Sequence, residues 1–137
     1  MSYLLDSNVL IAILNNRPQT VRDKWLRVSN DGEQVATSSI VIFELMYGAH
    51  KSARPKENIA RLNTLLSSSL EVLPFDLADA EHAGLNRATL EAGGQPIGPF
   101  DLLIAGQALR HGLMLVTANT KEFARVKGLA LENWEKL

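Results

Sequence analysis

The fold of this protein is decided by one stretch near its N-terminus, Ser2-Tyr3-Leu4-Leu5-Asp6-Ser7-Asn8-Val9-Leu10-Ile11-Ala12-Ile13-Leu14. Two apolar runs meet here at Asp6, which is the only charged residue before Arg17. Burying an unpaired carboxylate in apolar surroundings is costly unless hydrogen bonds or a cation satisfy it. We therefore expect the groups that satisfy Asp6 to mark the functional site.

The length and composition of the chain indicate a single globular domain. Its 137 residues, of which 46% are hydrophobic and 21% charged, predict one domain over residues 1–137. No apolar run approaches the roughly 18 residues of a membrane span. The start of the sequence lacks the features of a signal peptide, so we expect a cytoplasmic protein without membrane contact. The absence of cysteine excludes disulfides, thiolate nucleophiles and cysteine zinc sites.

The charge balance does not by itself indicate a nucleic-acid binder. Fourteen basic and fifteen acidic residues give a formal net charge of -1. Basic residues nevertheless cluster in three places, within residues 17–27, 51–61 and 121–127. Such clusters are found on solvated helix faces as well as on RNA-binding surfaces, so both interpretations stay open.

Periodicity and turn residues predict strands that alternate with helices. The expected strands are residues 3–5, 34–36, 71–73, 113–117 and 129–131, and the expected helices are residues 9–14, 19–28, 40–50, 55–66, 77–92, 102–110 and 121–123. This order predicts an α/β fold with a central parallel sheet of about five strands, flanked by helices on both faces. Ligands bind at the carboxyl ends of the strands of such sheets, where Asp6 and Asn119 fall.

Several local features of the helices are also predicted. Ser7 and Asn8 are expected to cap the first helix, and Pro18 to lie in the first turn of the second. The helix over residues 40–50 is apolar nearly all round and is expected to be buried on most faces. The helix over residues 77–92 is expected to turn one set of residues inward, namely Ala80, Ala83, Gly84, Ala88 and Leu90.

Three carboxylates stand alone in apolar runs and are the candidate metal ligands. Besides Asp6, Glu44 is the only charged residue between Glu33 and Lys51, and Asp101 the only one between Glu91 and Arg110. If they converge, they repel one another unless a cation holds them, and oxygen ligands favour Mg²⁺ or Mn²⁺ over zinc. Asp6 and Asp101 also precede helices, so simple capping is the competing interpretation for each.

The surroundings of these carboxylates supply further candidates. Asn119 is a possible neutral fourth ligand, either directly or through water. Ser7, Asn8 and Thr117 are candidate hydrogen-bond donors to the carboxylates. His50, His82 and His111 show no metal-ligand spacing.

Four blocks of the sequence carry a family resemblance. They are Leu4-Leu5-Asp6-Ser7-Asn8-Val9, then Ser38-Ser39-Ile40 through Glu44-Leu45-Met46-Tyr47-Gly48, then Pro96-Ile97-Gly98-Pro99-Phe100-Asp101-Leu102-Leu103-Ile104-Ala105, and finally Leu115-Val116-Thr117-Ala118-Asn119-Thr120-Lys121-Glu122-Phe123. In this order they resemble the PIN-domain ribonuclease toxins of the VapC type, from type II toxin-antitoxin systems. The resemblance spans essentially the whole chain.

The resemblance implies a magnesium- or manganese-dependent endoribonuclease. Asp6, Glu44 and Asp101 match the family's carboxylate ligands, and Asn119 matches a fourth catalytic position that is aspartate or asparagine in different members. Ala118 stands where close relatives often carry asparagine. The resemblance further implies a homodimer, a VapB-type antitoxin forming a larger hetero-oligomer with it, and a tRNA substrate cut in its anticodon loop, with initiator tRNA favoured by the Pro96–Asp101 loop.

Two other functions compete with the nuclease. A phosphoacceptor signalling domain needs an aspartate at the end of the middle strand, where Pro74 and Asp76 stand, and an acidic neighbour for Asp6, which is missing. A catalytically inactive PIN-fold module that binds RNA or protein is the second, for which Ala118 is the hint. Retention of Asp6, Glu44 and Asp101 favours the enzyme.

Overall fold

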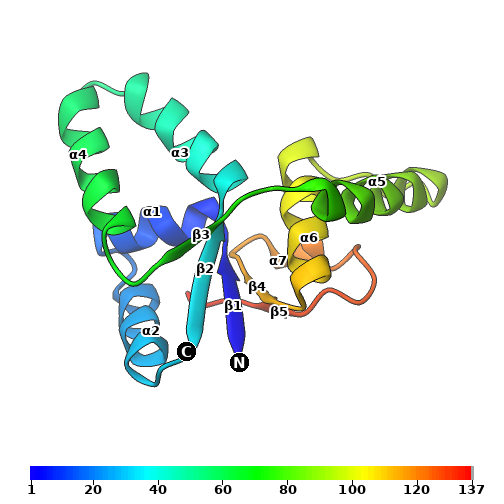
Figure 1. Ribbon diagram of the computed structural model, residues 1–137, viewed down its shortest axis with the longest axis horizontal. Helices are drawn as coiled ribbons and strands as arrows, with labels where there is room; N and C mark the ends of the chain where they lie inside the picture. The colour runs from blue at the N-terminus through cyan, green and yellow to red at the C-terminus, as the bar shows by residue number, and fades with distance from the viewer. Residues whose placement is uncertain (137) are drawn as a thin grey trace.

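The computed structural model describes residues 1–136 and contains one five-stranded sheet surrounded by helices (Figure 1). The strands are β1 (Ser2–Leu5), β2 (Gln34–Ser38), β3 (Glu71–Leu73), β4 (Met114–Val116) and β5 (Leu131–Glu132). The helices are α1 (Ser7–Asn15), α2 (Gln19–Asn30), α3 (Ser39–His50), α4 (Pro55–Leu66), α5 (Leu77–Ala92), α6 (Pro99–His111) and α7 (Thr120–Phe123).

The sheet is entirely parallel, with strand order β3-β2-β1-β4-β5. The first strand of the chain is therefore its centre, and Leu5 pairs with Thr37 on one side and with Val116 on the other. Figure 1 shows α1 to α4 on one side of the strands and α5 and α6 on the other. The predicted α/β architecture is confirmed.

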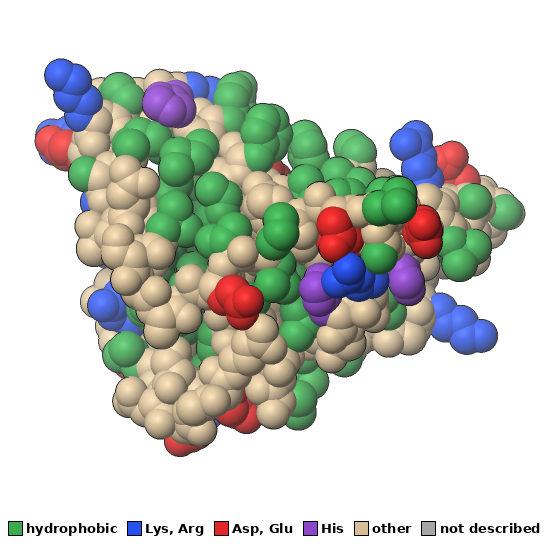
Figure 2. All heavy atoms as spheres, in the orientation of Figure 1, with side chains coloured by type: hydrophobic (Ala, Val, Ile, Leu, Met, Phe, Trp, Pro, Cys, Tyr) green, Lys and Arg blue, Asp and Glu red, His purple; other side chains and the backbone are tan. Residues whose placement is uncertain are grey.

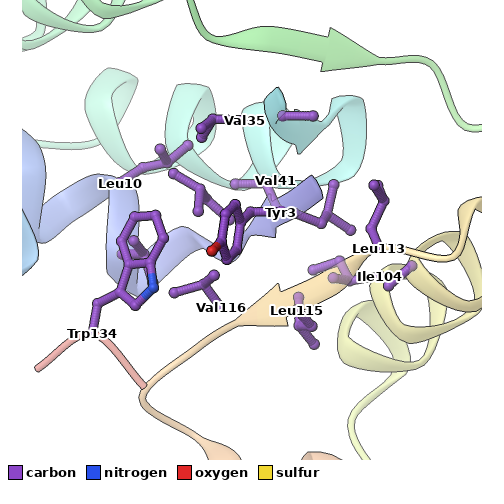
Figure 3. Packing of buried hydrophobic residues seen from close by; sticks show 14 of the residues in the cluster. Tyr3, Leu10, Val35, Val41, Ile104, Leu113, Leu115, Val116 and Trp134 are labelled. Atoms are coloured by element: carbon purple, nitrogen blue, oxygen red, sulfur yellow. The ribbon is translucent and has the colours of Figure 1, made fainter. Parts of the chain in front are cut away.

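The core lies on both faces of the central strands. Leu4, Leu5, Leu115 and Val116 are fully buried, as expected for strands covered on both faces. Figure 3 shows these strands packed between helices, with Tyr3 beside Trp134 near the C-terminus. Their rings meet edge to face with centroids 5.5 Å apart. Burial of these side chains fixes the positions at which β1 and β4 end.

Two predicted helix starts are wrong in detail. Asp6, and not Ser7 or Asn8, is the N-cap of α1, because its side chain accepts a hydrogen bond from the Ser7 backbone N–H. Pro18 occupies the N-cap position of α2 and lies just before its first turn. A cis peptide bond joins Arg17 to Pro18.

The final strand begins two residues later than predicted, at Leu131.

Two predictions of burial are wrong as well. In α3 only Val41 and Ala49 are buried, while the side chains of Phe43 and Tyr47 are 57% and 60% exposed. This helix packs against α4, α1, β2 and the start of α6, and its remaining side faces outward.

The inward side of α5 is narrower than predicted. Ala83 and Leu90 are buried, but Ala80, Gly84 and Ala88 are exposed. The cause is that α5 packs chiefly against one helix, α6.

Within residues 1–136, no helix combines the length and the apolar character that crossing a membrane would require.

Candidate active site at the carboxyl ends of the central strands

Asp6 lies at the carboxyl end of β1 with 3% of its surface exposed. Its carboxylate accepts hydrogen bonds from the Ser7 backbone N–H at 2.8 Å, from Thr117 Oγ1 at 2.8 Å and from Asn8 Nδ2 at 3.2 Å. Burial raises the pKa of Asp6 above its usual value, and these donors act against the shift. All three residues predicted to donate to the carboxylates therefore do so at Asp6.

Thr117 and Asn8 also fix the chain that leaves β4. Thr117 is buried, and its Oγ1 accepts a hydrogen bond from the Asn119 backbone N–H at 3.0 Å. The Asn8 Oδ1 accepts one from the Ala118 backbone N–H at 3.1 Å. The start of α1 and the end of β4 are thereby held together around the Asp6 carboxylate.

Glu44 reaches the same region from the second turn of α3. Its Oε1 is buried and has no hydrogen-bond partner among the described residues. Burial raises the pKa of Glu44, and the negative charge of Asp6 raises it further. A buried carboxylate oxygen without a partner is energetically unfavourable, so this atom is available to a bound cation or water.

Asp101 comes from the first turn of α6, after the loop that contains Gly98. Burial and the negative charges of Asp6, Glu122 and Glu44 together raise its pKa to about 7, with burial the largest cause. Asp6 also raises the pKa of Glu44, so each of the three predicted carboxylates lies near the other two. The three predicted carboxylates thus converge as expected.

Glu122, in the first turn of α7, is the residue that the sequence interpretation missed. It accepts hydrogen bonds from the Gly98 backbone N–H at 2.7 Å and from Asn119 Nδ2 at 2.9 Å, and it is hydrogen-bonded to Asp101. The Gly98 and Asn119 donors lower the pKa of Glu122. Its neighbours Lys121 and Arg125 make it look like part of a solvated helix, and its spacing of three residues from Asn119 is the available sequence signal.

Asn119 lies at the site, where its side chain contacts Glu122. Its amide nitrogen donates to Glu122 and its backbone N–H donates to Thr117. The side chain therefore orients a fourth carboxylate. Whether its oxygen binds a metal stays a prediction.

The carboxylate oxygens of the site are suitable ligands for a divalent cation, but they are not arranged around a common point in this structure. Within residues 1–136, no three Asp, Glu or His side chains lie close enough together to hold an ion in their present positions. Four carboxylates converge nonetheless, the pKa of three of them is raised, and Glu44 Oε1 has no partner. A hard cation would offset the repulsion and pair with the Glu44 oxygen once the side chains close around it.

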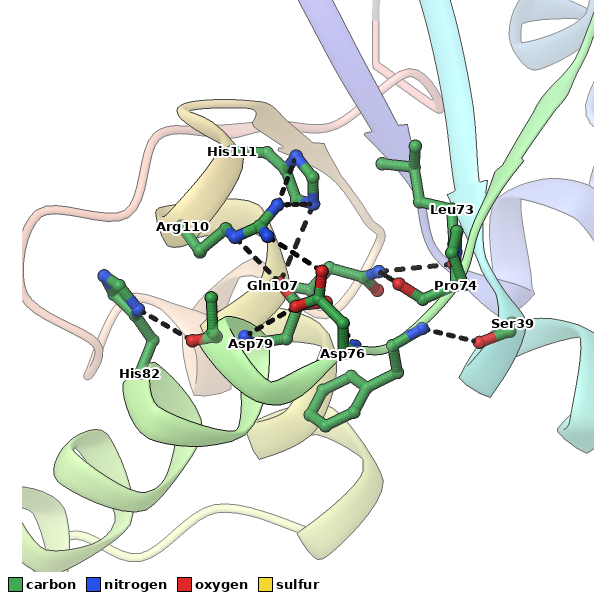
Figure 4. A network of polar contacts seen from close by, with 11 residues as sticks. Ser39, Leu73, Pro74, Asp76, Asp79, His82, Gln107, Arg110 and His111 are labelled. Carbon is green, nitrogen blue, oxygen red and sulfur yellow. Dashed lines mark hydrogen bonds and ion pairs between the residues drawn. The ribbon is translucent and has the colours of Figure 1, made fainter.

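Two of the histidines belong to a separate polar network between α5 and α6 (Figure 4). His111 Nε2 lies 3.7 Å from the buried Asp79, and Arg110 pairs with Asp76 at 2.8 Å. His82 contacts a backbone carbonyl of its own helix, 3.0 Å away. This network ties α5 to α6 and contributes nothing to the carboxylate cluster.

Part of the basic charge also has a structural use. Arg22 donates to the Ile13 carbonyl, and Arg61 donates to the Leu14 carbonyl and to Asn15. Both guanidinium groups thus satisfy the carbonyl end of α1. Of the basic clusters predicted from sequence, these two members are already engaged within the protein.

Comparison with known proteins places this site in a family. The sequence matches the PIN domain over residues 3–129. It is 42% identical over 134 residues to the tRNA(fMet)-specific endonuclease VapC of Shigella flexneri and 40% identical to that of Salmonella typhimurium, covering 98% of this chain and 98% of each relative.

Solved structures agree with the sequence match. The DNA-bound VapBC complex of Salmonella typhimurium superposes with a TM-score of 0.90 at 39% identity, covering 98% of both chains. VapBC-1 of nontypeable Haemophilus influenzae superposes with a TM-score of 0.85 at 36% identity, covering 99% of this chain and all of the other. Since the fold and the sequence agree, the chain belongs to the PIN-domain family and, within it, to the VapC-type ribonuclease toxins.

Proposed function

We propose that this protein is a Mg²⁺- or Mn²⁺-dependent endoribonuclease that cuts tRNA, with initiator tRNA as its preferred substrate. The observation that carries the proposal is the convergence of Asp6, Glu44 and Asp101, each with a raised pKa, at the carboxyl ends of the central strands. The two relatives named for tRNA(fMet) support the substrate. Relatives in Rickettsia felis and Haemophilus influenzae carry the broader name ribonuclease VapC.

Asp6, Glu44 and Asp101 are the residues that would hold the cation. When bound, a divalent ion supplies Lewis-acid activation of the phosphate and of the attacking water. The chain itself orients the ligands: Thr117, Asn8 and the Ser7 N–H fix the Asp6 carboxylate.

Asp101 is suited to holding the cation and orienting its water. Burial and the neighbouring carboxylates raise its pKa to about 7 in the metal-free protein, and a bound cation would lower that pKa, so Asp101 would be ionised as a ligand. Glu122, whose pKa is lowered, stays ionised and holds the Gly98 loop beside Asp101.

An antitoxin of the VapB type is the proposed protein partner, with the chain acting as a homodimer in a larger hetero-oligomer. The VapBC complexes among the structural relatives support this assignment. A groove of about 250 Å³ runs between α1, α3 and α4 and includes Glu44 in its wall. It is lined by Ile11, Leu14, Asn15, Glu44, Leu45, Gly48, Ala49, Asn58, Arg61 and Leu62.

The groove offers apolar surface to a bound segment and a carboxylate to a guanidinium at its end. An arginine of the antitoxin placed there would neutralise the cluster and compete with the cation.

Cleavage of purified total tRNA by the antitoxin-free protein tests the proposal. The reaction is run with Mg²⁺, with Mn²⁺ and with EDTA, and compared with Asp6→Asn and with Asp31→Asn, a control at an exposed aspartate outside the site. We expect metal-dependent cutting that Asp31→Asn retains and that Asp6→Asn lowers by ~1,000-fold or more, the scale on which metal and electrostatic catalysis contribute.

The other outcomes separate the alternatives. Cutting that survives in Asp6→Asn would refute the site. Metal binding without tRNA cutting would refute the substrate and point to another RNA. Neither metal binding nor cutting would favour the inactive binding module.

A further inference from the structure

The Gly98 loop, which joins α5 to α6 and includes Pro96, Ile97 and Gly98, places Asp101 in the site. Asp101 follows the loop in the first turn of α6. Pro96 has no backbone N–H, and Gly98, the N-cap of α6, has no side chain with which to cap the helix. Ile97 packs against the hydrophobic core. The backbone of the loop therefore depends on other parts of the chain for its hydrogen bonds.

Two side chains from one short segment supply hydrogen bonds to this loop. Glu122 Oε1 accepts a hydrogen bond from the Gly98 backbone N–H at 2.7 Å. Arg125 Nη1 donates a hydrogen bond to the Pro96 carbonyl at 2.9 Å. The loop is thus held at a backbone donor by one side chain and at a backbone acceptor by the other. Arg125 supplies the second of these contacts.

The segment that carries both side chains is anchored in the core. Phe123, which directly follows Glu122, is fully buried, and Val126, which directly follows Arg125, is 3% exposed. The Arg125 backbone N–H donates to the Glu122 carbonyl at 3.2 Å and closes a turn between them. The core therefore fixes the positions from which Glu122 and Arg125 reach the loop.

The backbone of Gly98 lies beside two carboxylates of the site. A Cβ built on Gly98 would lie 3.5 Å from Asp101 Oδ2 and 3.7 Å from Glu122 Oε1. Because the loop leads directly into the turn that carries Asp101, a shift of the loop would move the Asp101 carboxylate as well. Contacts that hold the loop therefore also hold Asp101 relative to Asp6 and Glu44.

Arg125 belongs to the basic cluster within residues 121–127, for which contact with RNA is the competing interpretation. On the face drawn in Figure 2, Lys and Arg side chains are spread over the surface and do not gather into one patch, so charge alone does not identify an RNA contact there. The hydrogen bond to Pro96 gives Arg125 a use within the protein. Arg22 and Arg61 have a similar use at the end of α1.

We propose that Arg125 is a positioning residue of the active site, which holds the Gly98 loop so that Asp101 faces the cation. This inference rests on the proposed metal-dependent ribonuclease function and adds to it a residue that acts on a metal ligand through the backbone. Groups that hold a metal ligand in place typically contribute roughly 10- to 100-fold to metal affinity or activity. Loss of Arg125 should therefore weaken metal binding although every ligand remains.

The test measures metal affinity separately from RNA cleavage. Binding of Mn²⁺ to the antitoxin-free protein is followed by electron paramagnetic resonance in the parent, Arg125→Ala, Arg125→Lys and Lys127→Ala. Lys127→Ala removes one positive charge from a neighbouring exposed position and is the matched control. Hydrogen exchange of the Gly98 N–H, followed by NMR in the metal-free protein, reports on the loop itself.

We expect Arg125→Ala to bind Mn²⁺ ~10-fold more weakly than the parent. Arg125→Lys keeps the charge and a donor, so it should bind Mn²⁺ more tightly than Arg125→Ala. Lys127→Ala should bind as the parent does. The Gly98 N–H should exchange faster in Arg125→Ala than in the parent and in Lys127→Ala, because the loop has lost one of its two contacts.

Unchanged Mn²⁺ affinity in Arg125→Ala would overturn the proposal. If that variant binds Mn²⁺ normally but binds tRNA more weakly, Arg125 contacts the RNA instead. A parent protein that neither binds Mn²⁺ nor cuts RNA would refute the proposed function. In that case faster exchange of Gly98 in Arg125→Ala would retain Arg125 as the residue that holds the loop, and unchanged exchange would refute this role too.

Discussion

The pKa of Asp101 depends on the charges of the other carboxylates in the site. Its pKa of about 7 results from burial and from three neighbouring carboxylates. The folded protein therefore retains a proton on Asp101 over a pH range in which the unfolded chain has lost it. By linkage, the free energy of unfolding falls as pH rises from about 4 to about 7, and this group adds no further change above that range.

Asp101→Asn should reduce this pH dependence. The substitution removes the repelled charge, so the free energy of unfolding of the metal-free protein should be higher than that of the parent at neutral pH and similar in acid. Urea unfolding in EDTA at about pH 5 and about pH 8 measures the slope. A smaller slope remains, because the pKa values of Asp6 and Glu44 are also raised. An unchanged slope would show that the pKa of Asp101 is not raised in the folded protein. RNA cleavage should be abolished.

Glu122→Gln tests the residue that sequence interpretation missed. The Gly98 N–H donates to Oε1 and Asn119 Nδ2 donates to Oε2, and glutamine replaces one of these oxygens by an NH2 group, so one of the two donors loses its acceptor. We expect a loss of ~1–2 kcal/mol in the free energy of unfolding. The pKa of Asp101 should also fall towards its usual value, because a charge that raises it has been removed. NMR titration of the carboxyl carbons measures that shift, and a pKa that stays near 7 would show that the charge of Glu122 does not contribute to it.

At the residue scale, sequence interpretation identified the carboxylates that are unusual for their surroundings. Asp6, Glu44 and Asp101 each interrupt an apolar run, and burial of a charge in such a run requires compensation. Glu122 could not be found in this way, because it stands between basic residues in a polar segment. Its role depends on the Gly98 loop, which is distant in sequence and meets α7 only in the folded chain.

At the scale of elements, hydrophobic periodicity predicted the strands and helices but not which sides are covered. The apolar residues of α3 suggested burial all round, yet the helix has neighbours on only part of its circumference. In α5 small residues suggested an inner face, and the close contact with α6 involves a narrower strip around Ala83.

The contact between α5 and α6 depends on Gly106. A Cβ built on Gly106 would lie 2.7 Å from the Ala83 backbone nitrogen and 2.8 Å from its Cα. Gly106→Ala must therefore push the two helices apart, and we expect it to lower the free energy of unfolding by ~1–3 kcal/mol despite the better helix propensity of alanine.

Gly84→Ala is the matched control for this prediction. Gly84 lies in the middle of α5, is exposed, and a Cβ there would have no atom within 4 Å. This substitution should raise the free energy of unfolding by ~0.5–1 kcal/mol. Urea denaturation of both variants measures the difference, and a Gly106→Ala protein as stable as Gly84→Ala would contradict the close approach of the helices.

At the scale of the whole molecule, the parallel sheet explains why distant segments share one site. Alternating strands and helices predicted this topology, and right-handed crossovers place the strand ends at one edge. The strand order β3-β2-β1-β4-β5 could not be derived from periodicity, because it depends on which strands pair. The order matters here because it sets β4, which Thr117 follows, directly beside β1, which Asp6 follows.

The central place of β1 has a consequence for synthesis of the protein on the ribosome. Asp6 emerges among the first residues, but its partner Thr117 and the carboxylates Asp101 and Glu122 are made only when most of the 137 residues have been translated. Long-range strand pairing of this kind cannot form before its second member exists. A growing chain thus cannot assemble the site until these late residues have been translated, so a partly made chain lacks the complete carboxylate cluster.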